Sequence, residues 1–336
     1  MIYIRATGNI SPQKTFGQAP FLTEPVEHAG NRLTCIEPDY NEIIDAKLIR
    51  RMSRVIKMGV AAAMQCLRAA GVETPDAVII GTAYGCLRDT EVFLTKIVEN
   101  QEEMLPPTAF IQSTHNTVGA QIALMLQCHG YNNTFVHRGS SFESAVLDAM
   151  MLLLENPDDH VLIGAVDEIT NTSHSLLSRM GLYRRGTVAG EGAAFFLLSA
   201  GPSATDIARL DAVTTFYNPG NSSATERSIS SFLASQSIRI SDIDLIITGR
   251  NGDEKNDRIY DQLQQSVLKG PLSVNYKHLC GEYPTSTAFA LWLAANSLKE
   301  GRLPTDIGVP TASIRRILIY NHSHNRHHSL LLVSAC

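Results

Sequence analysis

The 336-residue sequence has few charged residues for its length. Asp, Glu, Lys and Arg make up 18% of it, below the share of about 25% that is typical of soluble domains. Hydrophobic residues make up 44%, so the chain buries a large core and is not mainly disordered. The 28 basic residues are outnumbered by 33 acidic ones. This balance excludes a protein built around the phosphate backbone of a nucleic-acid duplex.

Long apolar runs and paired cysteines are missing as well. Runs such as Ala288 to Ala295 are far shorter than the roughly 18 residues that cross a membrane, so we expect no membrane span. The six cysteines are scattered, with no C-x-x-C pair, which is typical of reduced thiols in the cytoplasm. Residues 1–5 resemble an opening strand and lack the layout of a secretory signal. We therefore expect a cytoplasmic protein.

Strand-like runs alternate with helix-like segments along the chain. Strands are expected near residues 77–81, 133–137, 160–165, 194–199, 243–248, 314–320 and 330–333. Helices are expected near residues 45–71, 88–100, 116–128, 142–155, 225–235, 254–268 and 284–299. The alternation predicts an α/β fold with a mainly parallel sheet. The Gly-, Ser- and Asn-rich stretch 218–224 is expected to be a loop.

Four stretches together resemble the β-ketoacyl synthases of the thiolase superfamily. They are RRMSR at 50–54, followed by an alanine-rich helix, NTVGAQIA at 116–123, GTVAGEGAA at 186–194 and NYKHLCGE at 275–282. The third stretch is the most specific to the family. The residues that match the family's glycine-rich turn are Gly186, Gly190, Glu191 and Gly192. Glycines allow backbones to approach where a side chain would collide, so a plain tight turn also explains this motif.

The resemblance implies a thiolase-like fold. In this fold two pseudo-duplicated βαβ-rich halves form a layered α/β/α/β/α sandwich. We expect the halves at residues 1–200 and 201–336, packed as one compact unit.

The resemblance also implies where the reactive residues of the family would stand. Condensing members carry the acyl group on a cysteine thiolate at a strand-to-helix turn. Ser140 stands at that position here, with Gly139 as the alternative register. The two histidines that assist decarboxylation are replaced by Gly249 and Glu282, and the lysine is retained as Lys277. We expect no catalytic residue for condensation and no cofactor.

The Gly- and Phe-rich gating loop of the family is also missing. Residues 321–328 read NHSHNRHH in its place, and we expect them to form a loop. Four histidines in eight residues raise the alternative of a metal site. No cysteine or acidic residue lies at a supporting spacing, so we predict no metal.

The leading hypothesis is a non-condensing homologue that acts as a chain-length factor. Such a subunit forms a heterodimer with an active ketosynthase and helps to bound the pocket for the growing acyl chain, which an acyl carrier protein delivers. A clash with added methylenes limits chain length. The short length and the degenerate positions resemble the chain-length factors of aryl polyene or flexirubin-type pigment pathways.

Two regions are candidates for the subunit interface. They are the strand Asn133 to His137 and the region Phe110 to Val118. For Phe110, Phe142 and Met150 individually, an ordinary place in the core is the favoured interpretation.

Two alternatives remain open. One is an enzyme with an acyl-serine at Ser140 or Ser141, assisted by His137 or His115, with an acidic residue at 167 or 168 orienting the histidine. The other is a homodimer that binds an acyl chain or an acidic carrier protein. Its contact residues would be the basic set Arg50, Arg51, Arg54 and Lys57.

Overall fold

The computed structural model describes residues 1–336 except 18–20, 106, 184–185, 305–306 and 308–312. The strands are β1 (Ile2–Ile10), β2 (Ala77–Gly81), β3 (Tyr131–Phe135), β4 (His160–Asp167), β5 (Gly192–Ser199), β6 (Ala208–Tyr217), β7 (Leu245–Thr248), β8 (Leu272–Asn275), β9 (Arg316–Ser323) and β10 (His327–Ser334). The helices are α1 (Ala46–Ile49), α2 (Arg54–Ala70), α3 (Leu87–Glu99), α4 (Pro107–Gln112), α5 (Thr117–Leu126), α6 (Ser141–Glu155), α7 (Asn171–Arg179), α8 (Ser222–Ser235), α9 (Glu254–Gln265), α10 (Lys277–Cys280) and α11 (Thr287–Glu300). Among these helices none is long and apolar enough to cross a membrane.

The strands form one ten-stranded sheet in the order β3-β2-β4-β5-β1-β6-β10-β9-β7-β8. The two outer parts, β3-β2-β4 and β9-β7-β8, are parallel. The central strands β5, β1, β6 and β10 pair in antiparallel fashion. The expectation of a mainly parallel sheet was therefore wrong, because each half contributes two antiparallel strands to the centre of the molecule.

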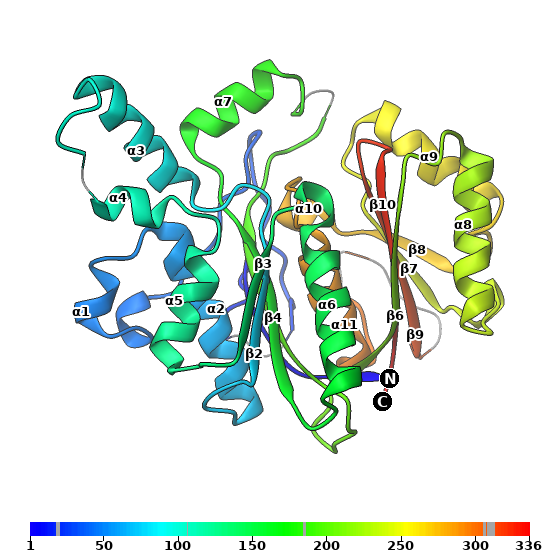
Figure 1. The fold of residues 1–336 in the computed structure, drawn as a ribbon. Helices are drawn as coiled ribbons and strands as arrows, with labels where there is room; N and C mark the ends of the chain where they lie inside the picture. The colour runs from blue at the N-terminus through cyan, green and yellow to red at the C-terminus, as the bar shows by residue number, and fades with distance from the viewer. Residues whose placement is uncertain (18–20, 106, 184–185, 305–306, 308–312) are drawn as a thin grey trace.

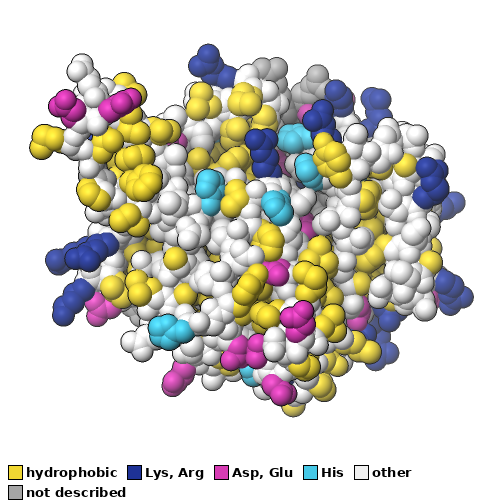
Figure 2. All heavy atoms as spheres, in the orientation of Figure 1, with side chains coloured by type: hydrophobic (Ala, Val, Ile, Leu, Met, Phe, Trp, Pro, Cys, Tyr) yellow, Lys and Arg dark blue, Asp and Glu magenta, His cyan; other side chains and the backbone are white. Residues whose placement is uncertain are grey.

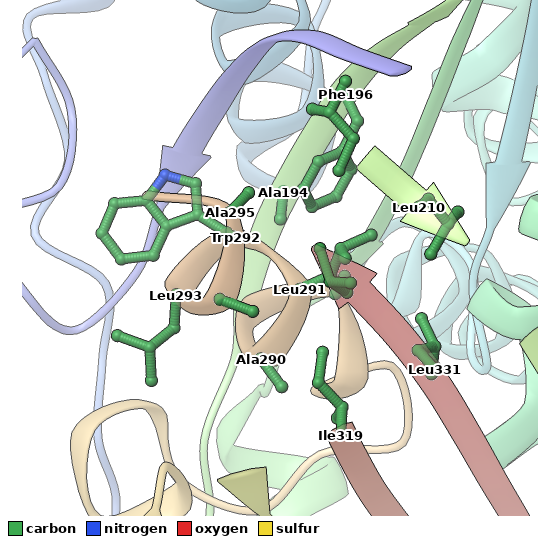
Figure 3. Packing of buried hydrophobic residues seen from close by; sticks show 14 of the residues in the cluster. Ala194, Phe196, Leu210, Ala290, Leu291, Trp292, Leu293, Ala295, Ile319 and Leu331 are labelled. Carbon is green, nitrogen blue, oxygen red and sulfur yellow. The ribbon is translucent and has the colours of Figure 1, made fainter. Parts of the chain in front are cut away.

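Three hydrophobic clusters define the layers. α2 and α5 pack on one face of the first half of the sheet, and α8 and α9 pack on one face of the second. α6 and α11 lie in the middle and contact strands of both halves (Figure 1). Figure 3 shows Leu291 of α11 between Phe196 of β5 and Ile319 of β9. This α/β/α/β/α arrangement is the predicted thiolase-like fold.

Two helices begin at residues other than those predicted. The expected helix 45–71 is divided, because the backbone is extended at Ser53 and α2 begins only at Arg54. α2 ends at Gly71, whose positive φ of 68° suits glycine. The expected loop 218–224 ends early, because the side chain of Asn221 accepts a hydrogen bond from the Ala224 amide and starts α8 at Ser222.

The histidine-rich stretch 321–328 is not a loop but the tip of a β-hairpin. It joins β9 to β10 by a turn at residues 324–326, where His324 and Asn325 both have φ of 53°. His322 and His328 are buried, and their rings stack on Tyr260 and Phe216 respectively. In the part of the chain that the structure describes, no group of three or more His, Cys, Asp or Glu side chains could hold a metal ion.

A buried carboxylate connects the glycine-rich turn to three other segments. Glu191 has no exposed surface and accepts hydrogen bonds from the amides of Cys35 and Ile169, at 2.9 and 3.0 Å. Both terminal nitrogens of Arg54 bond the same carboxylate, at 2.7 and 2.6 Å. Arg54 also pairs with Glu37. Arg54 is therefore a structural residue and not part of a free basic surface, contrary to the prediction.

We predict that Arg54→Met lowers the free energy of unfolding by about 3–5 kcal/mol, because it leaves the Glu191 carboxylate buried without its cation. Chemical denaturation followed by circular dichroism measures this loss. Glu37→Gln is the matched control, since it removes only the more exposed partner of Arg54 and should cost less than about 1 kcal/mol. Equal losses for the two variants would contradict the prediction.

Candidate functional site

The strand-to-helix turn that follows β3 is held by the side chain of Ser141. Its hydroxyl accepts a hydrogen bond from the His137 amide and donates one to the Arg138 carbonyl, both at 2.8 Å. Arg138 has a φ of 53°. Gly139 is buried against β9, where an added Cβ would lie 2.6 Å from the Ser323 Cβ. This packing leaves no room for a side chain at 139 without a shift, whereas Ser140 is half-buried.

The serine–histidine pairs considered from the sequence are not assembled in the structure. His137 Nδ1 lies 3.0 Å from the Ser144 hydroxyl instead of Ser140. His115 is exposed and stands next to Gly85. The histidine that does approach Ser140 is His327, whose Nδ1 is 3.5 Å from Ser140 Oγ. That distance is longer than an effective hydrogen bond. The sequence carried no signal for this contact, because the two residues lie far apart in the chain.

Asp167 and Glu168 bond other groups and not a histidine among the described residues. Asp167 accepts hydrogen bonds from the hydroxyls of Thr82 and Thr285, and from the amides that follow β2. Glu168 accepts one from the amide of Arg88 at the start of α3. Both carboxylates therefore fix loops around the turn.

The resemblance places Gly249 at one histidine position of the family, and the structure leaves no space for a side chain there. An added Cβ would lie 1.9 Å from Asn321 Oδ1 and 2.9 Å from the Tyr260 hydroxyl. The side-chain amide of Asn321 in turn donates to the Thr287 hydroxyl at 2.8 Å. The space next to residue 249 is therefore taken by Asn321, and a histidine there would require it to move.

Glu282, at the second histidine position, is bonded to Lys277. The Lys277 ammonium is buried and donates to Glu282 Oε2 at 2.7 Å. The side-chain amide of Asn251 donates to the same oxygen at 2.8 Å. The retained lysine thus balances the charge of the glutamate that replaces the histidine.

The space left between these groups is small. A cavity of about 100 Å³ lies next to the turn, with a lining that includes Tyr84, Arg138, Gly139, Tyr183, Glu282 and His324. It shares Tyr84, Arg138 and His324 with a wider cavity of about 960 Å³. On the other side of Asn251 and Glu282 lies a cavity of about 810 Å³. The enclosed space at the turn itself is therefore much smaller than either neighbouring cavity.

Three buried acids surround the turn, and burial raises the pKa of each. They are Glu143 on α6, Asp167 and Glu168. Glu143 is fully buried, and the loss of solvation is the main cause of its raised pKa. Burial raises the pKa of Glu168 to about 7.

We predict that Glu168→Gln flattens the pH dependence of stability between about pH 4.5 and 7. An acid whose pKa is raised in the folded state adds stability below its unfolded pKa and loses it as pH rises through the folded value. The gap between 4.5 and about 7 corresponds to about 3 kcal/mol. Denaturation at a series of pH values should show a contribution to the free energy of unfolding that falls as pH rises from about 4.5 to about 7 in the wild type. The variant should lack this contribution. If the free energy of unfolding of the variant depends on pH as steeply as that of the wild type, the raised pKa is not that of Glu168.

We also predict that Gly249→Ala lowers the free energy of unfolding by about 1–3 kcal/mol, because its methyl group collides with Asn321. The second-site change Asn321→Ser shortens the colliding side chain. The double variant should therefore lose less than the two single variants added together, as thermal unfolding can measure. Strict additivity would show that the two positions are not coupled.

The fold and the position of the turn define a protein of the β-ketoacyl synthase type. Residues 34–218 match the family of the β-ketoacyl synthase N-terminal domain. The match covers more than half of the sequence, so the chain belongs to this family. A search of the curated proteins finds no match.

Solved structures with similar folds cover the whole chain. The ishigamide ketosynthase/chain length factor has a TM-score of 0.81 at 18% identity, over 100% of this chain and 99% of that chain. A β-ketoacyl synthase from Burkholderia phymatum STM815 has a TM-score of 0.78 at 14% identity, with the same coverage. The ketosynthase ApeO in complex with its chain length factor ApeC, from Xenorhabdus doucetiae, has a TM-score of 0.76 at 16% identity, over 100% and 98%. At these identities the likeness establishes the fold.

Proposed function

We propose that this chain is a non-condensing subunit of the chain-length-factor type, which pairs with an active ketosynthase. The observation that carries the proposal is the closed reactive site. Ser140 stands where the thiolate would be, Asn321 fills the space at Gly249, and Glu282 is tied to Lys277. A cavity of about 100 Å³ supports a subunit that shapes a partner's tunnel and does not bind the chain at its own turn.

A free strand edge supports pairing with another subunit. β3 is the last strand of the sheet and pairs only with β2, so its outer edge presents unpaired backbone groups. The second interface candidate, Phe110, is 57% exposed and contacts Phe93 at a ring distance of 5.4 Å. The expectation of a core position was thus wrong for Phe110. Phe142 is fully buried, and Met150 packs against the same cluster.

The proposal extends to the substrate and the pathway. The growing chain would be delivered by an acyl carrier protein and held in the tunnel of the partner, with no cofactor on this chain. The short length and the degenerate positions favour an aryl polyene or flexirubin-type pathway in the cytoplasm. We place the division of the halves near residue 200, since β5 ends at Ser199 and β6 begins at Ala208.

The test is co-purification with an untagged, cysteine-containing synthase from the same gene cluster, followed by native mass spectrometry. We expect a one-to-one complex that condenses acyl chains only when both subunits are present. Phe110→Ser should weaken the complex, whereas the control Leu272→Ser, at an exposed apolar residue on the opposite sheet edge, should not. A stable homodimer that does not bind the synthase would refute the proposed function and favour the binding-protein alternative.

A further inference from the structure

The segment that forms the free edge of the sheet has an unusual charge composition. Residues 116–159, which include α5, β3, the turn and α6, contain one basic residue, Arg138, and no lysine. They contain five acidic residues, Glu143, Asp148, Glu155, Asp158 and Asp159. The whole chain carries a formal charge of −5, so this segment holds most of its excess negative charge.

The acids on this segment, apart from Glu143, reach the surface of the molecule. Glu155 and Asp158 are exposed, and Asp148 and Asp159 are partly exposed. Asp148 accepts a hydrogen bond from the Tyr131 hydroxyl at 3.0 Å, which places its negative charge next to the first residue of β3. Figure 2 shows acidic side chains in the lower middle of this view, with most Lys and Arg side chains toward the rim.

The same surface exposes apolar side chains on both sides of β3. Leu124 of α5 is 73% exposed, and on α6 Met151 is 58% and Leu154 is 73% exposed. Figure 1 places α5, β3 and α6 next to one another. A free strand edge between two exposed apolar strips is typical of a surface that another subunit covers.

The charge decides which subunit fits. In a symmetric homodimer both subunits contribute the same patch to the interface, so the acidic charge gathered there would be doubled. Like charges across an interface disfavour a complex, and opposite charges speed its formation. We propose that the acidic surface formed by residues 116–159 disfavours self-association and selects a synthase subunit with lysine or arginine residues around its own edge strand. This inference rests on the proposed function and specifies the partner.

The test measures the rate of association with the synthase at two salt concentrations. The variant Glu155→Lys/Asp158→Lys reverses two exposed charges at and just after the end of α6, and it should associate about tenfold more slowly than wild type at low salt. This difference in association rate should nearly vanish when the salt concentration is raised from about 50 mM to about 500 mM, because the Debye length shortens. The milder pair Glu155→Gln/Asp158→Asn should show an intermediate rate, and it provides a second measurement if the reversed variant fails to fold.

The matched control is Glu24→Lys/Glu300→Lys, which changes the net charge equally at exposed residues outside the segment. We expect its rate to stay within about twofold of wild type. If both reversed pairs slow association equally, or neither does, the acidic surface does not select the partner and the inference is overturned while the proposed function stands. If wild type does not bind the synthase at any salt concentration, the proposed function fails and this inference fails with it.

Discussion

The ion pair between Glu191 and Arg54 is the contact on which the geometry of the site depends. It gathers the start of α2, the segment at Cys35 and the segment after β4 around one fully buried carboxylate. The adjacent Gly190 then packs so closely on α10 that an added Cβ would lie 2.0 Å from the Cys280 carbonyl oxygen. The backbone of Glu282, two residues further on, bonds Val188 and Gly190 of the same turn at 2.8 and 3.0 Å, so the position of the Lys277–Glu282 pair depends on how this turn is held.

On the alignment that the resemblance implies, both residues that stand in for the family histidines have local partners. Glu282 is matched by Lys277 and Asn251, and the missing side chain at Gly249 is matched by Asn321. An unpaired charge or a void at these places would be costly. On that alignment, a histidine at 249 or 282 would therefore disturb the packing or the ion pair that the structure shows there.

Local patterns in the sequence predicted most of the fold, and contacts between distant residues explain the failures. The buried run at 77–81 and the helix ending at Gly71 could be recognised from apolar spacing and a glycine. The buried places of His322 and His328 could not, because they depend on rings from α9 and β6. Arg54 was misjudged for the same reason, since its partner Glu191 lies 137 residues away. At the site, the positions of the replaced residues stay a prediction, and the fit of Asn321 against Gly249 and the approach of His327 to Ser140 required the packed structure.

The turn keeps a fixed geometry although its thiolate is absent, and the chain path offers a physical reason. β3 runs directly into the turn and then into α6, so the free sheet edge and the former reactive site belong to one continuous element. The hydrogen bonds of Ser141 with residues 137 and 138 hold the end of β3 in line with α6. Loosening them would displace the edge that we propose as the subunit interface. On the proposed function, the geometry of the turn therefore serves the pairing of the subunits, whatever its chemistry.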